Sequence, residues 1–218
     1  MRIEATITAP DSIEELAAHA RELDRLGYDS LLVPEAGHDP FLPLILAAEH
    51  TRRVGLGTNV AIAFPRSPLV TAQVAWDLQQ LSRGRFRLGL ATQVRAHVER
   101  RYAAQWSDPP GRRLREYVQC LRAMFESFQK GEKPAFEGEH YRFTLMSPFF
   151  NPGPGEHPHV PIDLAAVNPY MARLAGELGD GLRLHPIATF RYAREVALPA
   201  LAEGARRAGR PAAELECI

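Results

Sequence analysis

The feature that most constrains the fold is a repeat in which a short apolar strand is followed by an amphipathic helix. Predicted strands begin near residues 3, 29, 54 and 85, the third extending over 54–63, so successive repeats are about 25 to 31 residues long. Ser12 and Glu15 form a capping box that begins the first helix, and Gly27 ends it. Two helix-to-strand junctions, LDRLGYDSLLV (23–33) and LAGELGDGLRLH (174–185), share an apolar helix end, a glycine and a buried strand. This alternation indicates an α/β protein with a parallel sheet and helices packed outside it. It leaves a barrel and a doubly wound sheet both open.

Residues 92–160 interrupt the repeat. They contain an arginine-rich loop, a helix over about 112–128, a hairpin over 135–143 and a Pro/Gly-rich loop over 149–161. The repeat then resumes with strands over 162–166 and 181–185, helices over 169–178 and 190–208, and a last strand from 214. Because the pattern returns, we expect one domain over 1–218 with an insertion after the fourth strand.

The number of strands bears on how the sheet closes. The pattern yields seven, whereas a (β/α)8 barrel typically needs about 250 residues. We interpret the chain as a barrel truncated within or after strand seven, or as a short variant closed by other means.

Composition excludes several classes of protein. Lys plus Arg and Asp plus Glu are both 26, so the net charge is zero and bulk attraction to nucleic acid or membrane surfaces is absent. Acids and a proline interrupt the stretch MRIEATITAPDS, so we expect no signal peptide there. No apolar run reaches about 20 residues and the two cysteines are far apart, so we expect a cytoplasmic protein. Only Lys130 and Lys133 are lysines, which disfavours Schiff-base and P-loop chemistry. Neither GxSxG nor GxGxxG occurs.

Chemistry in such folds gathers at the carboxyl ends of the strands. Glu35 and His38 follow the second predicted strand and are the best candidates for a general acid or base. The alternative is that Glu35 is a solvated loop charge and Asp39 caps a helix. Asn168, before Pro169, either caps a helix or begins a phosphate-binding turn.

Further polar residues admit two interpretations each. His185 ends a strand and either touches a ligand or packs locally. His157 and His159 are spaced like a pair of metal ligands, but no third ligand is nearby in the sequence, and a surface loop is the simpler interpretation. Six arginines within residues 94–115 either hold an anionic ligand tail or form a solvated face paired with acids.

Four stretches carry a resemblance to a known family. They are LGYDSLLVPEAGHDPFLPL (26–44), RVGLGTNVAIAFPRSPLVTAQVAWDLQQLSRGRFRLGLATQV (53–94), YRFTLMSPFFNPGPG (141–155) and LAAVNPYMARLAGELGDGLRLHP (164–186). The sequence resembles the bacterial luciferase-like superfamily of flavin and deazaflavin oxidoreductases, and more narrowly the branch that uses coenzyme F420. The resemblance implies a TIM-type (β/α)8 barrel with an insertion after strand four.

The resemblance also implies site residues. A non-prolyl cis peptide is expected at Asn59–Val60, and the cofactor-binding positions are Asn59, Val60, Ala91, Thr92, Gln93, Ala166, Val167 and Asn168. Family members usually have glycine at the positions of Ala91 and Asn168. Glu35 and His38 are the implied catalytic residues, although Ala36 and Gly37 separate them here. No metal ligand is implied.

The implied function is hydride transfer between coenzyme F420 and a small organic substrate, with Glu35 or His38 moving the accompanying proton. Arg66 either helps to hold the cofactor or seats the helix behind strand three. One alternative is an FMN-dependent monooxygenase. A second is a non-catalytic flavin-binding protein on a shortened barrel. The superfamily resemblance further suggests a homodimer that takes a small-molecule substrate.

Overall fold

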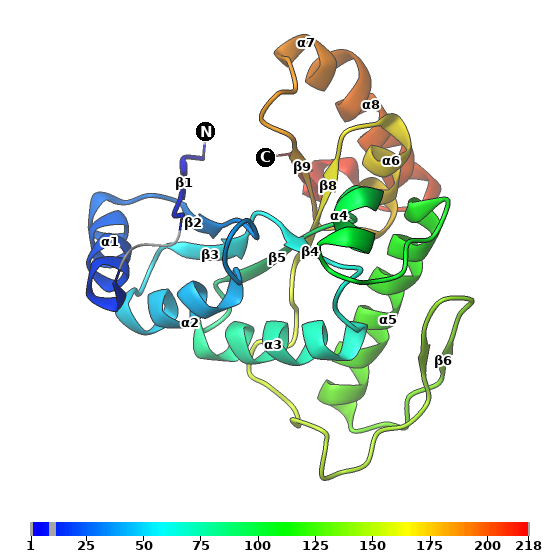
Figure 1. Cartoon of the computed structure of the whole chain (residues 1–218), viewed down its shortest axis with the longest axis horizontal. Helices are drawn as coiled ribbons and strands as arrows, with labels where there is room; N and C mark the ends of the chain where they lie inside the picture. The colour runs from blue at the N-terminus through cyan, green and yellow to red at the C-terminus, as the bar shows by residue number, and fades with distance from the viewer. Residues whose placement is uncertain (1, 9–11, 218) are drawn as a thin grey trace.

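The computed structural model describes residues 2–8 and 12–217, and it contains one curled parallel sheet (Figure 1). The strand order is β1-β2-β3-β5-β8-β9-β10, and β4 pairs with β5. The strands are β1 (Glu4–Thr6), β2 (Ser30–Val33), β3 (Gly55–Thr58), β4 (Ala61–Ile62), β5 (Phe86–Ala91), β8 (Ile162–Ala166), β9 (Gly181–Leu184) and β10 (Glu216–Cys217). This arrangement is an open part of a TIM-type barrel, which confirms the predicted fold class.

Helices cover the outer face of the sheet (Figure 1). They are α1 (Ile13–Leu26), α2 (Phe41–His50), α3 (Pro68–Leu81), α5 (Pro110–Lys130), α6 (Pro169–Leu178) and α8 (Leu198–Arg207). The predicted start and stop signals act as expected on α1. The Ser12 hydroxyl accepts a hydrogen bond from the Glu15 amide, and Gly27 ends the helix with a φ of 81°.

The predicted strand over 54–63 is divided in the structure. β3 ends at Thr58, the chain turns through Asn59 and Val60, and β4 then pairs with β5 through Ala61 and Leu90. The Asn59–Val60 peptide bond is cis, as the resemblance implied. The apolar pattern runs on through the turn because Ala61 and Ile62 are also buried. Periodicity alone therefore predicted one strand.

The insertion has the predicted hairpin, formed by β6 (Phe136–Glu137) and β7 (Arg142–Phe143). The arginine-rich segment is not simply a loop, because it contains the short helix α4 (Arg95–Arg100). The long helix predicted over 190–208 is also more complex. It is composed of α7 (Phe190–Tyr192), a π-helical turn (Ala193–Ala197) and α8. No helix in the described part of the chain is both long and apolar enough to cross a membrane.

The two edges of the curled sheet approach each other through charged side chains. β1 and β10 lie at the ends of the strand order and are not paired with each other in the described residues. Arg2, just before β1, forms an ion pair of 2.5 Å with Glu216 on β10. The apolar core lies between the sheet and the helices, with Leu31, Leu88 and Leu164 fully buried. This core fixes the strand ends that carry the site.

Candidate functional site

The structure has a cavity of about 910 Å³ at the carboxyl ends of the strands. Its walls come from the ends of β2, β3, β5, β8 and β9, from the first turn of α6 and from the segment that leads into α5. The size lies within the range of about 300–1,000 Å³ that is typical of small-molecule sites. The position is the one expected for ligands in parallel α/β folds.

The cavity collects the positions that the sequence analysis proposed for cofactor binding. Its lining includes Asn59, Val60, Ala91, Thr92, Gln93, Ala166, Val167 and Asn168. The turn with the cis peptide is held from below, because the Asn59 amide donates to the carbonyl of Val33 over 2.9 Å. Their contact with a cofactor stays a prediction, but the fold brings segments more than 100 residues apart to one cavity.

Glu35 also lines the cavity, and its carboxylate is heavily engaged. One oxygen accepts hydrogen bonds from the Ile62 amide (2.7 Å) and from the Arg66 guanidinium (2.6 Å). The other oxygen accepts from the Tyr102 hydroxyl (2.9 Å). The Glu35 side chain is only 6% exposed. The carboxylate therefore ties β4, the segment before α3 and the loop after β5 into one unit.

The neighbours of Glu35 are electrostatically matched to it. Burial opposes the charge of Arg66, but the Glu35 carboxylate outweighs this effect, with a smaller contribution from Asp39, and raises the pKa of the guanidinium. Burial and then Glu35 raise the pKa of the Tyr102 hydroxyl. Asp39 lies 2.9 Å from Arg66 and accepts a hydrogen bond from the Phe41 amide at the start of α2. These contacts agree with a structural capping role for Asp39.

His38 occupies a different environment from Glu35. It is exposed and is not among the residues that line the cavity. Ala36 and Gly37 separate the two residues, and the chain between them is exposed as well. Both catalytic assignments stay predictions, and only Glu35 stands at the cavity wall.

The start of α6 faces the cavity with its capping residue in place. Asn168 is the N-cap, and its side-chain oxygen accepts from the Met171 amide over 3.0 Å. Capping is thus confirmed, while phosphate binding stays a prediction. The two roles are compatible, because a capped helix N-terminus still presents backbone amides and a positive dipole end.

One wall of the cavity, at the start of α5, was not predicted from the sequence. Pro109, Pro110 and Gly111 line it, and Gly111 packs against Tyr170, because a Cβ atom there would come within 2.2 Å of the tyrosine ring. Arg113 holds this wall by lying 4.4 Å over the Phe64 ring and by donating to the Tyr141 hydroxyl (2.7 Å). The sequence indicates this wall only through the Pro-Pro-Gly stretch at which α5 begins.

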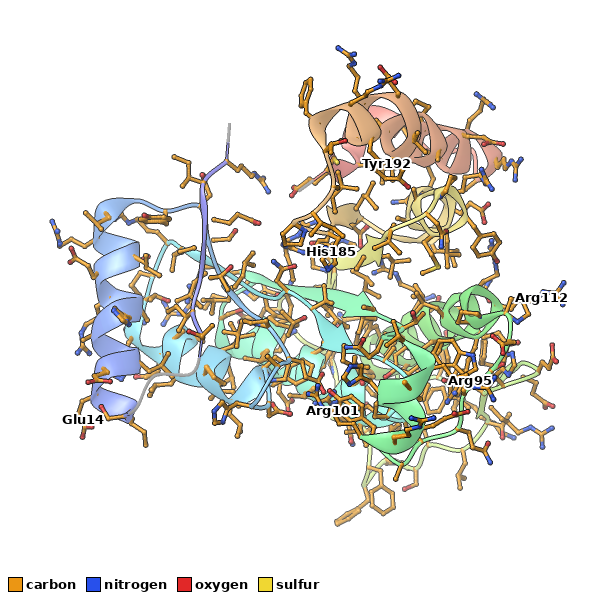
Figure 2. The ribbon with its side chains drawn as sticks, turned by 45° about the horizontal axis from the view of Figure 1, so that its top comes forward. Glu14, Arg95, Arg101, Arg112, His185 and Tyr192 are labelled. Atoms are coloured by element: carbon orange, nitrogen blue, oxygen red, sulfur yellow. The ribbon has the colours of Figure 1, made fainter. Side chains whose placement is uncertain are left out.

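The arginine cluster around this wall is partly paired. Arg95 forms ion pairs with Glu99 (3.0 Å) and Asp108 (3.7 Å), and Arg115 pairs with Glu177. The Arg101 guanidinium donates to the carbonyl of Ala36. Figure 2 shows Arg95, Arg101 and Arg112 on the same part of the molecule. The interpretation as arginines paired with acids is therefore supported for Arg95 and Arg115, while Arg101 and Arg113 bind carbonyl and hydroxyl oxygens instead.

A charged layer inside the curled sheet was also missed. Asp163 on β8 is fully buried and pairs with Arg87 on β5 (2.5 Å) and with Arg183 on β9 (3.0 Å). Arg183 also reaches Glu4 on β1 (3.3 Å) and contributes to the cavity wall. In the sequence, this layer is marked only by single charged residues within otherwise apolar strands, such as Asp163 in β8 and Arg183 in β9.

The histidines of the Pro/Gly-rich loop have structural partners. The His157 backbone pairs with the Gln80 side chain, and the His159 ring lies 3.8 Å from Asp180. Among the described residues, the group with metal-like spacing is Glu116, Glu139 and His140, which lies on α5 and the hairpin rather than at the cavity. There Glu116 accepts from the His140 amide (2.8 Å), so it fastens the hairpin.

Comparison with known families places the fold and the cavity in context. The chain matches the luciferase-like monooxygenase family over residues 1–218. It therefore belongs to this family, and the resemblance drawn from its sequence motifs is confirmed.

The chain is similar to individual members of this family. An uncharacterized protein of Mycobacterium tuberculosis is 45% identical over 215 residues, covering 99% of this chain and 63% of that protein. An F420-dependent glucose-6-phosphate dehydrogenase of Intrasporangium calvum is 34% identical over 215 residues, covering 90% of this chain and 61% of that enzyme. The chain thus spans less than two thirds of the length of these relatives.

A solved structure with the same fold is an F420-dependent secondary alcohol dehydrogenase in complex with an F420-acetone adduct. It superposes with a TM-score of 0.83 at 24% identity, covering 100% of this chain and 68% of that chain. At this identity the likeness concerns the fold.

Proposed function

We propose that the protein is an F420-dependent oxidoreductase that transfers a hydride between the deazaflavin and a small organic substrate. The observation that carries the proposal is the convergence of the predicted cofactor positions on one cavity of about 910 Å³. The F420-dependent relatives support the choice of cofactor.

The cavity suits a deazaflavin in shape and in chemistry. Small or apolar side chains, among them Val60, Ile62 and Ala165, line the cavity and would contact a planar ring. The amide end of α6 lies at the same cavity and suits a phosphate group without any lysine. When bound, the cofactor would supply a hydride-transferring carbon.

The chain's own residues would bind and orient this group. Val60 and Ala91 would lie against the ring, while Val167 and Asn168 would hold the phosphate through backbone amides. Glu35 would keep the turn at Asn59–Val60 in place through its bond to the Ile62 amide. If Glu35 moves a proton, its Oε1 atom would take it, because Oε1 accepts one hydrogen bond, from Tyr102, and has a second lone pair. Proton transfer by His38 would require the exposed loop after β2 to fold toward the cavity.

An absorbance assay tests the proposal. Purified protein is mixed with oxidised F420 and a panel of secondary alcohols and sugar phosphates, and the visible absorbance of the oxidised cofactor is followed with and without oxygen. We expect loss of absorbance with at least one substrate, independent of oxygen. Oxygen consumption with reduced FMN, and no turnover with F420, would favour the monooxygenase alternative. Tight binding without turnover of any kind would favour the non-catalytic one.

The proposal includes a homodimer, as the superfamily resemblance suggests, and a cytoplasmic location. Sedimentation velocity at micromolar concentration measures the first. A monomer at all concentrations would contradict it.

A further inference from the structure

His185 is an ionisable side chain at the cavity that takes part in none of the ion pairs described above. It follows β9, lines the cavity beside Pro186 and Ile187, and is exposed. Two charged side chains that line the same cavity have partners, because Glu35 accepts a hydrogen bond from Arg66 and the Arg183 Nε atom donates to Asp163. Among the described residues, the buried Nη2 atom of Arg183 has no hydrogen-bond partner. Figure 2 shows His185 in the central part of the molecule, where the chain leaves β9 toward α7.

The local backbone fixes one side of the His185 ring. The Ile187 amide donates to Nδ1 over 3.3 Å, and the Ala188 amide donates to the His185 carbonyl over 2.7 Å. Nδ1 can accept a hydrogen bond only if it carries a lone pair, so the neutral ring must carry its proton on Nε2. Nε2 lies on the other side of the ring from the Ile187 amide and is a hydrogen-bond donor.

The surroundings of this donor are apolar. Ile187 and Val167 are 82% and 65% exposed at the cavity mouth, and Leu184 and Pro186 complete the wall near the ring. A ligand oxygen that reaches this part of the cavity would therefore find its donor at His185.

We propose that His185 is a specificity-determining residue that donates its Nε2 proton in a hydrogen bond to the reacting oxygen of a ketone or aldehyde substrate. This inference rests on the proposed function. As the hydride joins the carbonyl carbon, the π electron pair moves onto the oxygen, and the oxygen then takes the accompanying proton, from Glu35, His38 or solvent, to give an alcohol. A neutral donor stabilises the negative charge on that oxygen without giving up its own proton, because doing so would leave an imidazolate.

The first test reads the ring directly. Long-range ¹H–¹⁵N spectra of the free protein report the tautomer of each histidine, and His185→Gln identifies the signal. We expect the Nε2–H tautomer at neutral pH. The Nδ1–H tautomer would overturn the inference. Because no cofactor is needed, this result stands even if deazaflavin fails to bind, and that failure would instead refute the proposed function.

The second test uses two matched substitutions. The amide nitrogen of Gln reaches about as far as Nε2, whereas that of Asn reaches about as far as Nδ1. With reduced F420 and a panel of ketones and aldehydes that includes acetone, we expect His185→Asn and His185→Leu to lower kcat about 100-fold. His185→Gln should stay within about fivefold of the unmodified protein, a difference of one hydrogen bond or less.

Affinity for oxidised F420 should be unchanged in all three variants. His19→Gln, on the exposed face of α1, is the control for loss of a histidine. Equal kcat in the Gln, Asn and Leu variants would overturn the inference. So would a protein that binds F420 and reduces no carbonyl compound in the panel.

Discussion

Replacing Gly89 by alanine tests how the cavity floor is built. Gly89 lies on β5 beneath the turn at Asn59–Val60, and an added Cβ atom would come within 2.1 Å of the Thr58 carbonyl oxygen. This contact is with backbone, so it cannot be relieved by a rotamer change. The Thr58 hydroxyl also donates to the Gly89 carbonyl over 2.7 Å, which holds the two strands together at this point.

The magnitude follows from overpacking against a fixed neighbour. Such clashes cost about 1–3 kcal/mol, whereas the loss of chain entropy that Gly→Ala relieves returns about 0.4–1 kcal/mol. A contact of 2.1 Å with a backbone atom puts the cost at the upper end of its range, about 3 kcal/mol, so after the entropy gain we expect Gly89→Ala to lower the free energy of unfolding by about 2 kcal/mol. With a urea m value of about 2 kcal/mol/M, the midpoint should fall by about 1 M. The melting temperature should fall by about 4–8 °C.

The assay is urea denaturation followed by far-UV circular dichroism. Gly37→Ala is the matched control, because a Cβ atom at Gly37 has no neighbour within 4 Å. F420 affinity should also fall in Gly89→Ala, since the turn at Asn59–Val60 must move. Equal free energies of unfolding for the two variants, within about 0.5 kcal/mol, would refute the account of the contact between Gly89 and the Thr58 carbonyl.

Three further predictions concern charge and burial. Val167→Asp places a carboxylate at the exposed start of α6 and should weaken F420 binding about tenfold in a fluorescence titration. Val70→Asp, which is 55% exposed and outside the cavity, should leave the affinity unchanged. Burial raises the pKa of the Cys120 thiol to about 11, so a thiol reagent at pH 8 should label the exposed Cys217 quickly and Cys120 only after denaturation. Rapid labelling of Cys120 in the folded protein would contradict its burial. Burial opposes ionisation of Asp180, but the neighbouring guanidinium and amide groups outweigh it and hold the pKa of the carboxyl below its ordinary value of 3.8. The stability that this carboxylate contributes should therefore be complete above pH 3.8 and fade as the pH falls further, so the difference in unfolding free energy between the wild type and Asp180→Asn should narrow there. A difference that stays constant down to pH 2 would contradict this assignment.

Much of the sheet could be predicted because its strands are apolar and regularly spaced. Ser30–Val33 and Ile162–Ala166 were expected within a residue, and the capping of α1 by Ser12 was read from a capping box. The division of the predicted strand over 54–63 into β3 and β4 could not be predicted, because residues on both sides of the turn are apolar and buried. Only the resemblance to a family pointed to the cis peptide.

The candidate site was predictable where it follows strand ends and not where it depends on tertiary contacts. Ala91 ends β5 and Asn168 lies two residues after β8, so both could be placed from the repeat alone. The contacts of Glu35 could not be predicted from the sequence, because its partner Tyr102 lies 67 residues further along the chain in an irregular loop. The buried Asp163 was passed over because a single acid in an apolar strand has no local signature. Its partners come from two other strands.

Binding of deazaflavin to the cavity is the central claim, and one titration tests it most directly. The protein is titrated with F420 and separately with FMN, and the ligand fluorescence is followed. We predict saturable binding at one site per chain, tighter for F420 than for FMN. Absence of saturable binding for both ligands, or tighter binding of FMN, would contradict the account.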